Sequence, residues 1–237
     1  MYHAGTFEGY GICEYISQRM NFRARFLPPI TLTIAAVLLM VIAWITGGWS
    51  LGYCLAPLTF TSLLSPGIGS TTKTRSERFA MLMGLIAGFA VALIMPVFHQ
   101  QLKTTTMISC LGVIALYAAV LSALARLLAQ RMPSTTAAGA VILLSATWLT
   151  WPIWATALIS GRVSGWLISL HPLFVINSLT PQLGNWTEQR VAYQLTNLGQ
   201  DATYQLPTSA WPFVFVYGAI AICLEVIQAS RARSVAV

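Results

Sequence analysis

Residues 73–98 read KTRSERFAMLMGLIAGFAVALIMPVF, a short charged cluster followed by an apolar run, 79–98, that contains no charged side chain. The hydrocarbon core of a bilayer is about 30 Å thick, and a helix of about 20 apolar residues crosses it. We therefore expect 79–98 to be a membrane-spanning helix. The whole chain agrees, because 57% of its residues are hydrophobic and 8% are charged, whereas soluble domains carry about 25% charged residues.

The same criterion predicts an all-α fold, a polytopic membrane helix bundle with six transmembrane helices. Residues 29–237 are expected to form one transmembrane domain, with spans at 30–48, 50–65, 79–98, 107–128, 136–160 and 211–228. The run 50–65 is short, contains Pro57 and is rich in Ser and Thr. We nevertheless count this run as a span, because the distribution of basic residues between the two sides of the membrane favours it.

Basic residues favour cytoplasmic loops, and six spans place ten of them on one side and three on the other. The ten are Arg19, Arg23, Arg25, Lys73, Arg75, Arg78, Arg126, Arg131, Arg231 and Arg233, and the three are Lys103, Arg162 and Arg190. We therefore expect both termini in the cytoplasm and an integral protein of a bacterial inner (plasma) membrane. The net charge of +7 indicates membrane orientation and not a nucleic-acid partner.

Two segments outside the spans are expected to lie at the membrane surface. Residues 1–28 are too polar to cross, and within them 13–26 predicts a short interfacial helix, with a disordered basic tail as the alternative. The outer loop 161–210 contains an apolar stretch, 165–179, that is too short to span and is interrupted by His171 and Pro172. Such a stretch is typical of a re-entrant or interfacial segment.

Small residues recur every four positions in two of the spans. They are Ala80, Gly84, Gly88 and Ala92 in the third span and Ala115, Ala119 and Ala123 in the fourth. Small residues one turn apart let helix backbones approach closely in lipid. The pattern predicts that spans three and four pack tightly against each other along these positions.

The sequence contains no constellation typical of an enzyme, a cofactor or a metal. No phosphate-binding loop, HExxH or dinucleotide fingerprint is present, so we expect no catalytic residues and no ATP hydrolysis by this chain. The GxSxG pattern at 48–52 joins two apolar runs and lacks the context of a nucleophile elbow. A weaker alternative is a membrane-embedded enzyme that uses His171, Glu188 or Asp201 at the outer surface.

Glu225 is the one acidic residue inside an apolar span. Intramembrane carboxylates are costly and often functional, so Glu225 either pairs with a basic neighbour such as Arg231 or Arg233, or serves transport or coupling. The cluster 73–78 likewise has two interpretations. It is either an anchor that fixes the topology or a docking surface for a cytoplasmic partner.

This layout resembles the permease of ABC-2 type exporters, on the interfacial segment 13–26, the six runs, Glu77–Arg78 and the segment 165–179 with its following loop. The resemblance implies a permease that pairs with another permease chain as a homo- or heterodimer and binds a separate ATPase. It also implies an ATPase-coupling surface. The residues expected there are Arg19, Arg23, Arg75, Glu77 and Arg78. The rival expectation is a non-catalytic structural subunit of a larger membrane complex.

Overall fold

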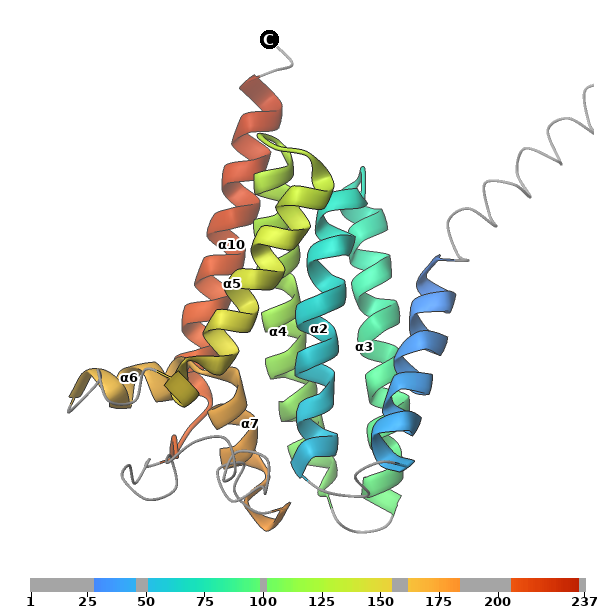
Figure 1. Ribbon diagram of the computed structural model, residues 1–237, viewed down its shortest axis with the longest axis vertical. Helices are drawn as coiled ribbons and strands as arrows, with labels where there is room; N and C mark the ends of the chain where they lie inside the picture. Colours follow the sequence, from blue (N-terminus) through green and yellow to red (C-terminus); the bar gives the residue numbers. More distant parts are fainter. Residues whose placement is uncertain (1–27, 46–50, 99–101, 155–161, 184–205, 235–237) are drawn as a thin grey trace, which may run out of the picture.

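The computed structural model describes residues 28–45, 51–98, 102–154, 162–183 and 206–234, and all of the secondary structure in these ranges is helical. The long helices run side by side, with the shorter ones at one end of the bundle (Figure 1). They are Pro28–Ile45, α2 (Leu51–Thr71), α3 (Arg75–Phe98), α4 (Thr104–Ala129), α5 (Ser134–Trp154), α6 (Arg162–Leu170), α7 (Pro172–Leu179), the short 3-10 helix η2 (Pro181–Leu183) and α10 (Trp211–Ser234).

Four of these helices are long and apolar enough to cross a membrane, which confirms the expected membrane helix bundle. They are Pro28–Ile45, Arg75–Ile94, Thr104–Ala129 and Trp211–Arg231. The interfacial helix expected at 13–26 lies outside the described residues.

Helix α2 is longer than the run 50–65 that the sequence indicated. It continues from Leu51 to Thr71 with Pro57 and Pro66 inside it, so its 21 residues measure roughly 31 Å at 1.5 Å each. Hydroxyl side chains in and after this helix donate to carbonyls three or four residues earlier, as Ser62 does to Leu58 at 2.8 Å. These bonds satisfy part of the polar groups of α2, and Thr61 and Ser65 are buried within the bundle, so the Ser and Thr content of the run is compatible with a membrane helix.

Helix α4 lies at the centre of the bundle. It packs against α2, α3, α5, α7 and α10, and 50% of its apolar window is buried, against 11% for the helix Pro28–Ile45 at the edge. Helix α2 approaches α4 closely at Gly69, where a Cβ would overlap the main chain of Ser122. The core therefore forms around α4, and Pro28–Ile45 lies on the outside of α3 (Figure 1).

The glycines of the third span lie in a helix contact, but their partner is not the fourth span. A Cβ on Gly84 would lie 2.5 Å from the carbonyl oxygen of Pro29, and one on Gly88 would lie 2.5 Å from the Cβ of Ala36. The Thr33 hydroxyl also donates to the Gly84 carbonyl at 2.8 Å. The expectation that these glycines face α4 is thus corrected, because Pro28–Ile45 occupies that face of α3.

The remaining small residues of the two spans differ in how far they are buried and in the contacts that they make. On α3, Ala92 is buried and its carbonyl accepts a 2.7 Å hydrogen bond from the Tyr53 hydroxyl of α2, whereas Ala80 is half-buried. On α4, Ala115 and Ala119 are half-buried and Ala123 is buried. Helices α3 and α4 do contact each other, so the hairpin exists without a strict seam of small residues.

The apolar stretch 165–179 is divided between two short helices. Helix α6 projects sideways beside the ends of α5 and α10, and α7 runs along the lower parts of α2 and α4 (Figure 1). Helix α7 contacts α2, α4 and α6 and buries Phe174, Val175 and Ile176. The break falls at His171, whose backbone is extended, and Pro172 occupies the first turn of α7, where its missing N–H costs nothing. Residues 184–205 of the expected outer loop lie outside the described residues.

Candidate functional sites at the two ends of the bundle

Helix α3 begins with a capping box built by Thr74 and Glu77. The Thr74 hydroxyl accepts from the Glu77 backbone N–H at 3.1 Å, and the Glu77 carboxylate accepts from the Lys73 backbone N–H at 3.0 Å. Such a pair satisfies N–H groups that have no partner within the helix. Glu77, one of the residues expected at a coupling surface, therefore has a structural role at the start of α3.

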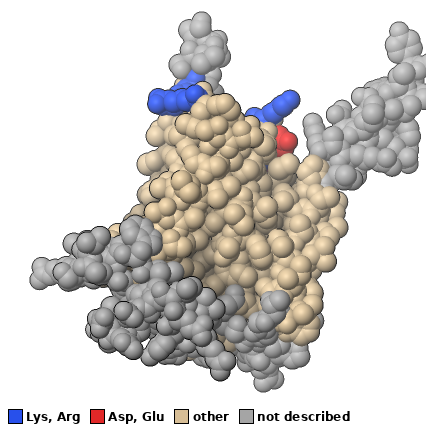
Figure 2. Space-filling model, in the orientation of Figure 1, with Lys and Arg blue, Asp and Glu red and all other residues tan. Residues whose placement is uncertain are grey.

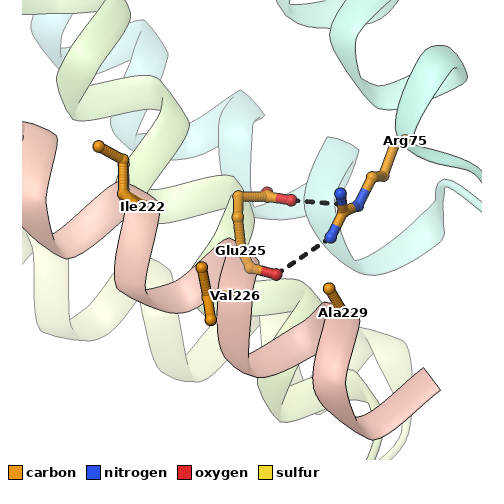
Figure 3. A pocket seen from close by; sticks show the side chains of 6 residues that line it. Arg75, Ile222, Glu225, Val226 and Ala229 are labelled. Atoms are coloured by element: carbon orange, nitrogen blue, oxygen red, sulfur yellow. Dashed lines mark hydrogen bonds and ion pairs between the residues drawn. The ribbon is translucent and has the colours of Figure 1, made fainter. Parts of the chain in front are cut away.

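Arg78 and Glu225 form an ion pair that joins α3 to α10. The Arg78 Nη2 donates to Glu225 Oε1, and the Arg78 side chain is only 7% exposed. Arg75 approaches the same residue, with its Nε 3.4 Å from Glu225 Oε2 and its Nη2 donating to the Glu225 carbonyl at 3.0 Å (Figure 3). Glu225 is thus shared by a buried and an exposed guanidinium.

Gln228 extends this pair to the central helix. Arg78 Nη1 donates to Gln228 Oε1 at 3.3 Å, and Gln228 Nε2 donates to the carbonyl of Ala123 on α4 at 2.7 Å. Arg126 of α4 donates to the Lys73 carbonyl at 3.0 Å. We call Arg75, Arg78, Arg126, Glu225 and Gln228 the charged cluster. It ties α3, α4 and α10 together at one end of the bundle.

Sequence reasoning found three members of the charged cluster without finding the cluster. Arg75, Arg78 and Glu225 were each selected, but the partner of Glu225 lies 147 positions away on α3 and the expected neighbours were Arg231 and Arg233. Gln228 and Arg126 were missed. One feature of the sequence could have indicated the charged cluster. Gln228 lies one turn after Glu225 in an apolar helix, and this spacing puts both side chains on one face of the helix. Arg19 and Arg23 lie outside the described residues.

The charged cluster shares its end of the bundle with other basic residues. Figure 2 shows Lys and Arg side chains and an acidic side chain at the end where α2 connects to α3 and α4 connects to α5. The basic residues of these two connections are Lys73 and Arg131. Lys103 instead precedes α4, and Arg162 begins α6.

At the opposite end, His171 lies in a buried aromatic cluster that we define as His171, Trp148, Trp151 and Phe174. The ring centroid of His171 is 5.4 Å from that of Trp148, 5.8 Å from Trp151 and 5.2 Å from Phe174. The His171 side chain is fully buried, and its Nε2 lies 2.9 Å from the Trp148 carbonyl. His171 is thus a hydrogen-bonded residue at the break between α6 and α7.

The protonation of His171 follows from these contacts. A carbonyl oxygen can only accept, so Nε2 carries the hydrogen and Nδ1 of the neutral ring is an acceptor. Burial lowers the pKa of His171 to about 4, although the backbone hydrogen bond acts in the opposite direction. Among the described residues, His171 Nδ1 and Trp151 Nε1 are buried without a hydrogen-bond partner. The aromatic cluster is therefore neutral at physiological pH and incompletely hydrogen-bonded.

Between the two ends, the polar groups that the described core buries are neutral hydroxyls. The Tyr117 hydroxyl lies 2.6 Å from that of Ser145, between α4 and α5. On α2, the buried hydroxyls of Thr61 and Ser65 have no hydrogen-bond partner among the described residues. Within the described ranges, no cluster of three His, Cys, Asp or Glu residues could hold a metal.

The alternative of an enzyme at the outer surface named His171, Glu188 and Asp201. His171 has no exposed surface, while Glu188 and Asp201 lie outside the described residues. Comparison of the chain with protein-family models, with curated proteins and with solved structures finds no match.

Proposed function

We propose that this chain is the membrane-spanning permease subunit of an ABC-type exporter, which moves its substrate with energy from a separate ATPase. The observation that supports this most is the pair α6 and α7. Two short helices lie between the long helices α5 and α10, at the end opposite the charged cluster, and α7 packs back against α2 and α4. Re-entrant helices at this position are what the resemblance to ABC-2 permeases implies.

The proposal includes six spans with both termini in the cytoplasm. Helices α2 and α5 have 21 residues each and lie among the long helices, which supports counting them as spans. The charged cluster would then face the cytoplasm, as the positive-inside rule favours. A membrane-impermeant thiol reagent tests this in intact cells. Thr208→Cys should react and Thr74→Cys should not, and labelling of Thr74→Cys from outside would disprove the topology.

The polar side chains buried in the described core between the two ends are neutral, which supports a permease that carries molecules and not protons or inorganic ions. The buried polar residues of the described core between the two ends are Ser, Thr and Tyr, and proton or ion relays need ionisable groups within the membrane. Energy would then have to come from a partner, because the chain has no phosphate-binding loop.

The proposed contact with an ATPase is limited to charged side chains that are exposed at this end of the bundle. Arg78 is buried and bound to Glu225 and Gln228, and Arg75 reaches toward α10. Lys73 and Glu77 are exposed at the turn between α2 and α3. We place the contact on this turn, since charge complementarity sets register and encounter rate at such surfaces.

Co-expression with the ATPase encoded beside this chain tests the proposal. Lys73→Glu combined with Glu77→Lys keeps the net charge and leaves the charged cluster intact, so membrane insertion should be unchanged. The double variant should lose most of the co-purifying ATPase. Glu77→Gln separates the two roles of Glu77, because glutamine can still accept from the Lys73 N–H but carries no charge. It should leave the start of α3 intact and lose only part of the co-purifying ATPase.

The alternative, a structural subunit of a larger membrane complex, predicts a different result. The chain would then be recovered with other integral membrane subunits and never with an ATPase. Unchanged ATPase recovery by the charge-reversed variant would instead place the contact elsewhere on the chain.

A further inference from the structure

A groove beside the charged cluster combines a guanidinium with an apolar wall. It has a volume of about 290 Å³ and is lined by Arg75 and Glu225 and by the α10 residues Ala221, Ile222, Val226 and Ala229. Figure 3 shows Arg75 reaching from the start of α3 toward Glu225, with the apolar side chains along α10. The groove is therefore polar where α3 begins and apolar along α10.

The charge at the polar part of the groove favours an anion. Glu225 is already paired with the buried Arg78, so the positive charge of Arg75 is not needed to neutralise it. The Arg75 side chain is 57% exposed, and its two contacts with Glu225 use Nε and Nη2, not Nη1. Beyond Arg75 and the Arg78–Glu225 pair, Lys73 and Arg126 add two positive charges, and Glu77 adds one negative charge that binds the start of α3.

The position of the groove indicates which anion it fits. Arg75 begins the apolar window of α3, and Glu225 lies in the last turns of the window that ends at Arg231. Both therefore lie at the boundary between hydrocarbon and water, where lipid phosphates lie. Ile222 and Val226 are 66% and 61% exposed, so they offer an apolar surface that a free phosphate cannot use and an acyl chain can.

We propose that this groove binds an anionic phospholipid, with its phosphate on Arg75 and an acyl chain along Ile222 and Val226 of α10. A guanidinium donates several N–H groups to phosphate oxygens in a fixed geometry, and anionic lipids are attracted to basic residues at the membrane surface. The inference needs only that α3 and α10 cross the bilayer. It does not depend on an ATPase partner.

Lipid retention by the purified full-length chain tests this inference. Native mass spectrometry would compare phosphatidylglycerol with phosphatidylcholine, each added to the delipidated protein in detergent. We expect at least one phosphatidylglycerol to be retained preferentially. Arg75→Gln should reduce its retention about five-fold, as expected for one basic residue near an anionic surface.

Two variants make the test specific. Arg131→Gln removes an exposed basic residue at the same end of the bundle and should not change retention. Val226→Trp fills the groove while leaving the charges in place, and should reduce retention as Arg75→Gln does, even if the arginine variant folds poorly. Equal retention of both lipids, equal losses in Arg75→Gln and Arg131→Gln, unchanged retention in Val226→Trp, or displacement of the lipid by glycerol phosphate would each overturn the proposal.

Discussion

The two ends of the bundle bury polar groups in opposite ways. In the charged cluster, Arg78 binds Glu225 and Gln228, and Gln228 binds the Ala123 carbonyl, so the buried charge of Arg78 has a partner. In the aromatic cluster, His171 makes one hydrogen bond and leaves Nδ1 without a partner among the described residues. A buried charge must be paired to be tolerated, whereas a neutral ring can be held by packing alone. The charged cluster is thus stabilised mainly by its ion pair and hydrogen bonds, and the aromatic cluster mainly by the packing of its rings.

The largest expected effect is at the charged end. Glu225→Leu leaves Arg78 buried without its counter-charge, which should cost about 3–5 kcal/mol of unfolding free energy. Thermal unfolding of the detergent-solubilised protein would measure it. Arg78→Met combined with Glu225→Leu should recover most of the loss, since no unpaired charge remains. If the double variant were less stable than the single one, the pair would have a role other than mutual neutralisation.

At the aromatic end, the size of the side chain should matter more than its hydrogen bond. His171→Ala opens a cavity among Trp148, Trp151 and Phe174, and we expect a loss of about 2–4 kcal/mol. His171→Phe keeps a ring of similar size and should cost less than about 1.5 kcal/mol. The same unfolding measurement separates the two variants. Equal losses would show that the hydrogen bond to the Trp148 carbonyl holds this end, and the contrast between the ends would fail.

Acid should weaken the aromatic end specifically. Burial lowers the pKa of His171 to about 4, against about 6.5 in an unfolded chain. Between these values the unfolded chain binds more protons, so stability present at pH 7 is lost as the pH falls from about 6.5 through 4, by roughly 2 kcal/mol at pH 5. The stability of His171→Phe should fall less steeply with pH than that of the wild type. Identical pH profiles would exclude His171 as the titrating group.

The smallest effect concerns the exposed half of the charged cluster. Arg75→Gln removes a guanidinium that is 57% exposed, and exposed ion pairs contribute about 0–1 kcal/mol and are screened by salt. We expect a loss below about 1 kcal/mol that disappears in 0.5 M NaCl. A larger, salt-insensitive loss would mean that Arg75 and Arg78 hold Glu225 jointly.

The membrane character of the chain and the approximate position of its helices could be predicted from the sequence, because a helix that crosses a bilayer requires a long apolar run. The length of helix α2 was underestimated, since hydropathy does not show that Ser62, Ser70 and Thr71 donate to carbonyls of their own helix. The break at His171 and Pro172 was recognisable, because proline cannot continue a helix.

Partners across helices could not be predicted. The spacing of Gly84 and Gly88 indicated a close contact, but it contains no information about which helix makes it. For the same reason Glu225 was identified as unusual without its partner Arg78, since periodicity describes one helix at a time. Gln228 and the Ala123 carbonyl entered the site only through the arrangement of α4 and α10.

The separation between Arg78 and Glu225 along the chain has a consequence for biogenesis. Translation proceeds at about 5–20 residues per second, so the 147 residues between them take roughly 7–30 s to synthesise. Throughout that interval α3 is present without the carboxylate that neutralises Arg78, and the guanidinium must keep its hydration by extending to the membrane surface. Helix α10 is made after the other described helices, so a ribosome that stalls before α10 leaves a chain in which Arg78 has no carboxylate partner.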